Sequence, residues 1–468
     1  MVSVAKQPSR GSIHLGNQLS YQEVVELLTR NWSIKRPSIA LEHIKRLDAA
    51  LGNPSKNLHT ILVTGTNGKS LTLNYASRLL REEGLTVGTY FSPHILTYNE
   101  RICVNQETVL NKGFTDLANE VINTAQSLGI EAHSSEILLM IALLYFKQSN
   151  VDVALLEVEQ AGEEDPTAIC YPKIAAITRI VAEGSESLDT SIRKAVYMAQ
   201  KDTYVVSADQ SKFNLQMMAD KVKERQAQWA MPIRKLAALN YPLEQLHGRC
   251  AALAERIAQL YVEHFTAKNA TIISNSILIK PKGQRGRPSL EAKKHAELNP
   301  KRTIEQFWKE DMPLMGRFQL LDKEKPTVLL DNARNIDALK NLFLGIRLLH
   351  YQRPLKGLTL LIGAYKDSFD TQEFLKLARY FFKKTSGSLI FFPIDNVVPA
   401  TIPQDVWDVE KITNDVKSLK IKARAAKNFK EAFEVAKKSV DERHGLIVVT
   451  GSCSAINEYW NYKGIKKL

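Results

Sequence analysis

The chain has 468 residues, which is enough for two or three domains and too many for one ordinary domain. Hydrophobic residues make up 44% of the chain and charged residues 24%, so it can bury sizeable cores and lacks the composition of a disordered protein. The longest strongly apolar run, 137–146, covers about half of what a bilayer span needs. The N-terminus shows no signal-peptide core. We therefore expect a cytoplasmic protein without membrane contact.

The cysteines are widely spaced and form no CxxC pair: Cys103, Cys170, Cys250 and Cys453. This spacing excludes a disulfide scaffold and a cysteine-based zinc site. It is typical of a protein in a reducing compartment, which agrees with the expected cytoplasmic location.

The chain is basic, with 63 lysines and arginines, 50 aspartates and glutamates, and a net charge of +13. About half of this excess lies in residues 280–302, which carry eight basic and two acidic residues. Such a segment is usually a solvated linker. Its RGRP motif could instead enter a DNA minor groove. Because no aromatic platform or reading helix accompanies the motif, we expect a linker and no nucleic-acid partner.

Strands and helices alternate in the first half of the chain, which predicts an α/β domain with a mainly parallel sheet. The predicted strands span 59–64, 87–91, 153–158, 173–180 and 203–208. The predicted helices span 71–83, 135–147 and 247–265.

The alternation restarts after the basic segment and predicts a second α/β domain. Its predicted strands span 327–331, 358–363, 388–393 and 445–451, and its predicted helices span 371–384 and 428–443. Aspartate or glycine ends several of these strands, where ligands meet parallel sheets. We therefore expect an N-terminal domain at 1–279, a basic linker or loop at 280–311 and a C-terminal domain at 312–468.

The segment 63–70, VTGTNGKS, lies between a predicted strand and a predicted helix. Gly65 and Gly68 let the backbone turn tightly around an anion, and the following helix adds its positive N-terminal end. Lys69 could neutralise phosphate charge, and Ser70 could offer a hydroxyl to magnesium. The spacing differs from the usual phosphate-loop motif, because Val63 stands in place of the first glycine. A plain strand-to-helix turn is the alternative, which the order of strand, GTNGKS and helix disfavours.

Further motifs follow in a fixed order along most of the chain from Leu51 onward. They are LGNPSKNLHTILVTGTNGKS at 51–70, GLTVGTYFSPHILTYNERICVN at 84–105, LLEVEQAGEED at 155–165, MGRFQLL at 315–321, VLLDNARNIDALK at 328–340 and VVTGSCSAINE at 448–458. Together they resemble the folylpolyglutamate synthase and dihydrofolate synthase branch of the Mur ligases. The resemblance implies a P-loop ATPase-like N-terminal domain with a parallel-rich sheet and a Rossmann-like α/β C-terminal domain.

The resemblance also implies a ligase that uses ATP and Mg²⁺. In that family a substrate carboxylate accepts the γ-phosphoryl group, and the amine of L-glutamate attacks the resulting acyl phosphate. The implied reaction adds L-glutamate to a folate. A dihydrofolate synthase reaction, which joins glutamate to dihydropteroate, uses the same machinery and stays open. We expect a monomer whose partners are small molecules: a folate or pteroate, L-glutamate and ATP.

Site residues follow from the resemblance position by position. It implies ATP binding by Gly65, Thr66, Asn67, Gly68, Lys69, Ser70, Arg317 and Asp331. It implies metal binding by Ser92 and Glu136, with Glu183 in place of an aspartate of the family. Lys69, Arg317 and Ser452 are the implied catalytic residues, and Ser452 matches a serine near the incoming glutamate.

Several positions depart from the family's pattern. Gly184 stands in place of a histidine metal ligand, Met198 in place of a carbamylated lysine, and Arg334 in place of the histidine of DGAHNP. One interpretation is a working ligase in which another carboxylate holds the metal: Glu157, Glu159 or Glu183. The other is a degenerate homologue that binds nucleotide without catalysis, because a lost metal ligand and a lost carbamate remove charge stabilisation from phosphoryl transfer.

Overall fold

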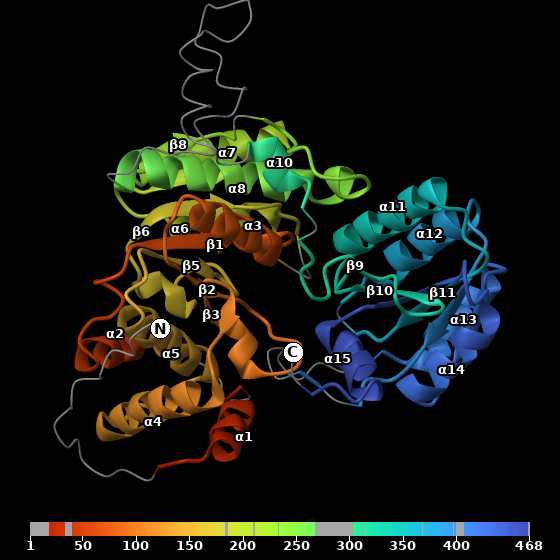
Figure 1. The fold of residues 1–468 in the computed structure, drawn as a ribbon, viewed down its shortest axis with the longest axis horizontal. Coiled ribbons are helices and arrows are strands. Elements are labelled where there is room, and N and C mark those ends of the chain that lie inside the picture. The colour runs from red at the N-terminus through yellow and green to blue at the C-terminus, as the bar shows by residue number, and fades with distance from the viewer. Residues whose placement is uncertain are drawn as a thin grey trace, which may run out of the picture.

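The computed structural model describes residues 18–32, 40–182, 186–208, 211–232, 234–266, 303–310, 312–366, 368–395, 397–398 and 407–466. The described chain forms two α/β domains that lie side by side (Figure 1), an N-terminal one around an eight-stranded sheet and a C-terminal one around a six-stranded sheet. This confirms the expected fold class. No helix in the described ranges is both long and apolar enough to span a membrane.

The N-terminal sheet has the strand order β4-β3-β2-β5-β1-β6-β7-β8. Its strands are β1 (Thr60–Thr64), β2 (Val87–Tyr90), β3 (Ile102–Val104), β4 (Glu107–Thr108), β5 (Val153–Glu157), β6 (Pro172–Ile177), β7 (Tyr204–Ser207) and β8 (Gln228–Ala230). The neighbouring strands β2, β5, β1, β6, β7 and β8 pair in parallel. At one edge β3 pairs antiparallel with β2, and β4 pairs antiparallel with β3. Every residue of β1 and β5 is buried, as expected for parallel strands covered on both faces.

Helices cover both faces of this sheet. One face packs on α3 (Lys69–Glu82) and α8 (Leu243–Phe265). The other face packs on α1 (Tyr21–Asn31), α2 (Ala40–Ala50), α4 (Asn111–Ser127) and α5 (Ser134–Gln148). A smaller cluster lies between α6 (Leu188–Tyr197), α7 (Lys212–Glu224) and strand β7. Two 3₁₀ turns, η1 (Tyr98–Arg101) and η2 (Pro166–Ile169), lie in the connections from β2 to β3 and from β5 to β6.

The C-terminal sheet has the order β13-β12-β11-β14-β10-β9, and only β9 runs antiparallel to its neighbour among the described strands. Its strands are β9 (Gln319–Leu321), β10 (Thr327–Asp331), β11 (Leu358–Ile362), β12 (Ser388–Phe391), β13 (Lys422–Ala425) and β14 (Leu446–Thr450). One face packs on α11 (Ile336–Gln352), α12 (Thr371–Phe382) and α13 (Val409–Ser418), and the other on α14 (Phe429–Ser439) and α15 (Cys453–Tyr462).

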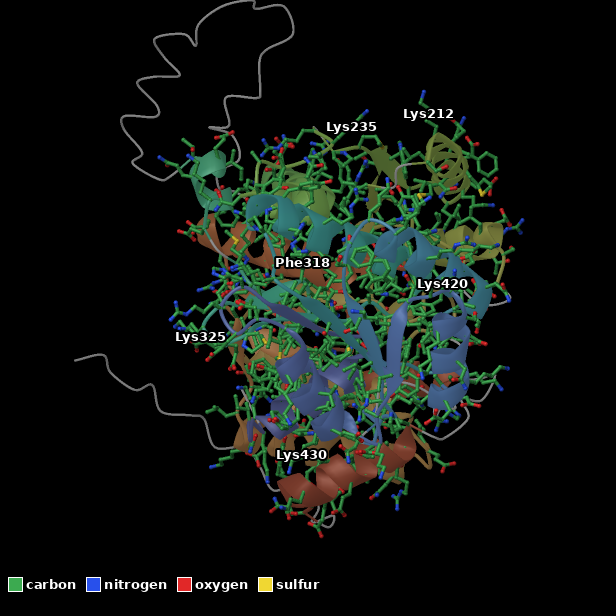
Figure 2. The ribbon with its side chains drawn as sticks, turned by 90° about the vertical axis from the view of Figure 1, so that its right-hand side faces the viewer. Lys212, Lys235, Phe318, Lys325, Lys420 and Lys430 are labelled. Carbon is green, nitrogen blue, oxygen red and sulfur yellow. The ribbon has the colours of Figure 1, made fainter. Side chains whose placement is uncertain are left out.

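The domains meet through a hydrophobic contact that Phe318 makes. Figure 2 shows Phe318 near the middle of the molecule, whereas Lys212 and Lys325 project from its periphery. The Phe318 ring meets the His247 ring of α8 edge-on, with 6.4 Å between centroids. On its other side the ring lies against Gly345 of α11, where an added Cβ would come within 2.2 Å of it. Phe318 therefore packs between one helix of each domain.

The structure changes one predicted boundary. Residues 280–302 of the predicted linker lie outside the described residues, but Thr303 caps α10 (Ile304–Trp308). This short helix packs into the core that α3 and α8 share, and its Trp308 meets the ring of Tyr75 edge-on at 5.2 Å. We therefore propose that α10 belongs to the N-terminal domain. The sequence prediction missed this helix because a short apolar stretch follows a long charged one.

Replacing Trp308 tests this boundary. Trp308 is 1% exposed, and its indole N–H donates to Glu255 of α8. We expect Trp308→Ala to lower the free energy of unfolding by about 3–5 kcal/mol, because it removes a large buried side chain. Urea unfolding of the full chain measures this. A loss below about 1 kcal/mol, which is typical of surface substitutions, would place α10 in the linker.

Candidate active site

The loop from Gly65 to Gly68 follows β1 and leads into α3, as the sequence predicts. Gly65 and Gly68 have φ angles of 124° and 94°, which lie in the left-handed region. A Cβ on Gly65 would lie 2.2 Å from Thr178 Oγ1, and one on Gly68 would lie 2.8 Å from Cys250 Sγ. Both the backbone conformation and the space available therefore require glycine at these two positions.

The loop has the features of an anion site. Lys69 is the first residue of α3, so the N-terminal end of a 14-residue helix points at the loop. Its Nζ donates to the carbonyl oxygen of Gly65 at 2.8 Å, folding the side chain back over the loop. A phosphate bound here would meet backbone N–H groups, the helix dipole and the lysine charge.

Next to the loop, Glu157 joins neighbouring segments of the sheet. Its Oε1 accepts a hydrogen bond from Ser70 Oγ at 3.1 Å, and its Oε2 accepts one from the backbone N–H of Ser92 at 3.3 Å. Arg317 of the C-terminal domain donates from Nη2 to Ser70 Oγ at 3.1 Å. Burial raises the pKa of the Glu157 carboxyl, and the nearby charges of Lys69 and Arg317 act in the opposite direction. Residues far apart in the chain thus form one buried polar cluster.

The loop that carries Ser92 is held by Arg101, which is fully buried. Arg101 donates from Nη1 to Ser92 Oγ at 3.2 Å and from Nε to His94 Nδ1 at 3.0 Å. Its guanidinium also lies 5.2 Å from the centre of the Trp32 ring. Burial, followed by the Arg101 charge, lowers the pKa of His94 well below its ordinary value. A neutral His94 can therefore accept the Arg101 hydrogen bond.

The structure leads us to reassign one proposed metal ligand. Glu136 sits in the first turn of α5, where its carboxylate accepts the backbone N–H of His133 at 2.7 Å and forms a capping box. The carboxylate beside Ser70 and Ser92 is instead Glu157, at the end of β5. We therefore replace Glu136 by Glu157 in the proposed ligand set. Glu183 and Gly184 lie outside the described residues, so the prediction for Glu183 stays a prediction.

The C-terminal domain carries three of the predicted site residues: Arg317, Asp331 and Ser452. Arg317 reaches Ser70, as described above. Asp331 ends β10 and accepts the backbone N–H of Phe318 at 2.8 Å. Ser452 caps α15: its Oγ donates to the Gly363 carbonyl oxygen at 2.8 Å and accepts the Ala455 N–H at 3.1 Å. The structure therefore gives Ser452 a capping role, and its predicted contact with glutamate stays a prediction.

The structure places two of the residues that depart from the family pattern. Met198 is 2% exposed and belongs to the core beneath α5, where its Sδ accepts the Gly162 N–H at 3.4 Å. The methionine therefore serves as a packing residue. Arg334 lies exposed in the turn between β10 and α11.

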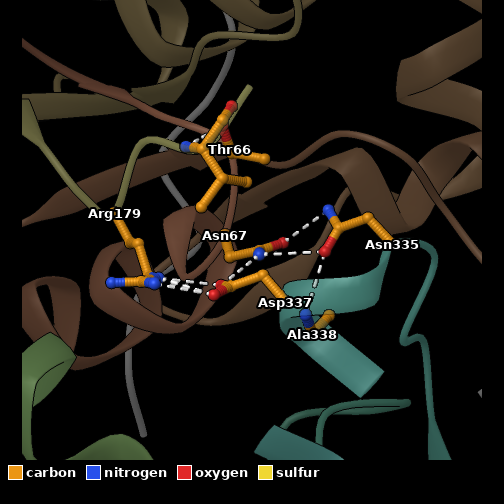
Figure 3. A network of polar contacts seen from close by, with 7 residues as sticks. Thr66, Asn67, Arg179, Asn335, Asp337 and Ala338 are labelled. Carbon is orange, nitrogen blue, oxygen red and sulfur yellow. Dashed lines mark hydrogen bonds and ion pairs between the residues drawn. The ribbon is translucent and has the colours of Figure 1, made fainter. Parts of the chain in front are cut away.

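The sequence did not reveal a polar network between the phosphate loop and α11 (Figure 3). Asn67 pairs with Asn335, and Arg179 pairs with Asp337. The sequence analysis assigned no role to Arg179. Asp337 gave no signal, because the pair is 158 residues apart in the chain and depends on how the domains meet.

No family model matches this chain. The dihydrofolate synthase/folylpolyglutamate synthase of Bacillus subtilis is 25% identical over 441 residues, covering 89% of this chain and 93% of the relative. Over most of its length the chain is similar in sequence to the folylpolyglutamate synthase/dihydrofolate synthase family. This confirms the resemblance inferred from the motifs.

Solved structures of this family share the fold. The Yersinia pestis bifunctional enzyme, complexed with AMPPNP and a Mn ion, superposes with a TM-score of 0.71 at 21% identity over 96% of this chain and all of that one. The Escherichia coli protein, in complex with DHPP and ADP, gives a TM-score of 0.72 at 19% identity over 94% and 97% of the two chains. The two-domain arrangement is therefore the family's own.

Asp331 predicts that the free energy of unfolding depends on pH. Burial raises the pKa of its carboxyl from 3.8 to about 6, against the opposing Phe318 hydrogen bond and Arg317 charge. A raised pKa stabilises the fold while the group is protonated, and this contribution is lost as the pH rises from about 4 to about 6. We expect Asp331→Asn to gain stability relative to the parent across that interval and to level off above it. Urea unfolding at pH 4 to 7.5 measures this, and a pH-independent difference would contradict it.

Proposed function

We propose that this protein is an ATP-dependent ligase that adds L-glutamate to a folate through an acyl phosphate. The observation that carries the proposal is the buried cluster of Ser70, Ser92 and Glu157 beside Lys69, which Arg317 reaches from the other domain. It combines an anion loop, cationic side chains and hard oxygen ligands at the contact between two domains. Phosphoryl transfer from ATP needs all three.

The donor set fits a magnesium ion. Mg²⁺ is commonly held by one or two carboxylates together with hydroxyls, waters and substrate phosphates, and the Ser70 and Ser92 hydroxyls and the Glu157 carboxylate meet this description. Within the described residues, no group of three or more His, Cys, Asp or Glu side chains could hold a metal ion. The proposed ion therefore depends on nucleotide phosphates as further ligands, and its chemistry would be to neutralise charge on the phosphate oxygens.

In the proposed reaction, the chain's own residues orient the phosphates and exclude water. Backbone N–H groups of the loop and the Lys69 charge orient the β- and γ-phosphates, and Arg317 stabilises charge on the transferring group. An oxygen of the substrate carboxylate forms the bond to the γ-phosphorus, and ADP leaves. The amine of glutamate then attacks the acyl carbon, phosphate leaves, and the nitrogen loses a proton. The domain contact shields the acyl phosphate from hydrolysis.

The two family reactions differ in the acceptor, either a reduced folate or dihydropteroate. The described residues favour neither. A second candidate function is nucleotide binding without catalysis, which the packing role of Met198 supports, since a methionine cannot form the family's carbamate.

One assay tests the proposal: release of ADP by the purified protein with ATP, Mg²⁺, L-glutamate and either tetrahydrofolate or dihydropteroate. We expect ADP release that requires both the pterin acceptor and glutamate. Lys69→Ala is expected to abolish it while leaving the thermal unfolding midpoint nearly unchanged, because the lysine contributes a charge aimed at phosphate. ATP binding without acceptor-dependent release would favour the second candidate function.

The metal assignment has its own matched pair of variants. We expect Glu157→Gln to lower activity by about 10- to 100-fold and to weaken Mg²⁺ dependence, because it removes the proposed carboxylate ligand. Glu136→Gln should leave activity nearly unchanged, since glutamine still supports a capping box. Titrating Mg²⁺ for both variants measures this. A larger loss in Glu136→Gln than in Glu157→Gln would restore the original assignment.

A further inference from the structure

An ion pair joins the two domains beside the phosphate loop. Arg179 follows β6 in the N-terminal domain, and Asp337 lies in the first turn of α11 in the C-terminal domain. Arg179 Nε donates to Asp337 Oδ1 and Oδ2 at 2.9 and 2.8 Å, and its Nη2 lies 2.8 Å from Oδ1. Figure 3 shows the guanidinium facing the carboxylate across the gap between the ribbons. Two nitrogens on one edge of the guanidinium group thus engage one carboxylate, an arrangement that is stronger than a single contact.

Asn67 of the phosphate loop takes part in the same contact. Its Nδ2 donates to Asp337 Oδ2 at 2.9 Å and to Asn335 Oδ1 at 3.1 Å. Asn335 returns a hydrogen bond from its own Nδ2 to Asn67 Oδ1 at 3.0 Å. Asn335 is also the N-cap of α11, since its Oδ1 accepts the Ala338 N–H at 2.9 Å. The start of α11 is therefore fastened directly to the loop.

Arg179 holds the loop from the other side with its main chain. Its carbonyl oxygen accepts the N–H of Thr66 at 2.8 Å and the N–H of Asn67 at 3.3 Å. One residue therefore fixes the loop through its backbone and the C-terminal domain through its side chain. Any shift of α11 relative to Arg179 must also pull on Asn67, because Asp337 contacts both.

The negative charge of Asp337 suits its position at the start of α11, and the ion pair with Arg179 is partly exposed to water. Asp337 lies where the dipole of the 17-residue α11 favours a negative charge. The Arg179 side chain is 39% exposed and that of Asp337 23% exposed, so the pair is only partly withdrawn from water. Salt screens such a pair. The contact can therefore hold the domains together without locking them.

From these contacts we propose that Arg179 and Asp337 are positioning residues that form an interdomain clasp. The clasp keeps α11 against Asn67, and with it the orientation in which Arg317 reaches Ser70 beside the phosphate loop. Without the clasp the domains open further and the loop loses its support. The proposal deepens the proposed function, and its predictions for KM and kcat rest on that function. The radius of gyration of the nucleotide-free protein tests the clasp without any turnover.

The experiment compares the full-length parent with Arg179→Gln, Asp337→Asn and the double variant. We expect each single variant to have a larger radius of gyration in solution scattering without nucleotide, and an ATP dissociation constant raised about fivefold or more. Thermal unfolding midpoints should change little, because the pair is partly exposed. In an active preparation, KM for ATP should rise more than kcat falls. Arg353→Gln is the matched control, since it breaks a 2.8 Å ion pair with Asp322 inside the C-terminal domain.

The double variant decides whether the two residues act together. If they form one clasp, the double variant should match the more impaired single variant, because the second substitution has nothing left to break. Arg179→Lys should fall between the parent and Arg179→Gln, as it keeps the charge and loses the fork geometry. Unchanged scattering in both single variants, or effects that multiply in the double variant, would overturn the proposal. So would an equal change in Arg353→Gln.

Discussion

The arrangement of the site depends on one constraint, a carboxylate buried at the end of the central strand β5. Glu157 is 3% exposed, and an unpaired charge there would be costly. The first turn of α3 supplies Ser70, the loop after β2 supplies Ser92, and the C-terminal domain supplies Arg317 through Ser70. Because β2, β5 and β1 are neighbours in the sheet, their carboxyl ends bring these groups together. Satisfying Glu157 therefore assembles the same oxygens and cations that phosphate chemistry needs.

Much of this could be predicted from the sequence, because much of it is local. The glycines and lysine of GTNGKS specify a turn that leads into a helix, and the apolar runs of β1 and β5 specify buried parallel strands. Which carboxylate faces the loop is a different question, since strand order decides it. Glu157 ends the strand beside β1, whereas Glu136 lies at the other end of the connecting α5 and caps it. The proposed ligand set therefore takes Glu157 in place of Glu136, and the metal assignment stays a prediction.

Met198 and Arg179 illustrate two ways in which the fold accommodates a residue that the motifs do not explain. Met198 stands where the resemblance implies a carbamylated lysine, and the structure buries it in a hydrophobic core. Arg179 adds a charge at a strand end, and a carboxylate on the other domain accepts it. Neither the burial of Met198 nor the ion pair of Arg179 can be predicted from one position of the sequence alone. Each needs the partner residue, and the partners of Arg179 are set by how the domains meet.

Two of the polar contacts between the described parts of the domains differ in how strongly water affects them. The Arg317 contact with Ser70 lies beside a buried carboxylate, where a low dielectric strengthens it and makes loss of a partner expensive. The Arg179 contact with Asp337 is partly exposed, so water and salt weaken it. A ligase must close to exclude water and open to release ADP and product. Placing the strong contact at the chemistry and the weaker one beside the loop allows opening to begin at the clasp, before the buried cluster has to break.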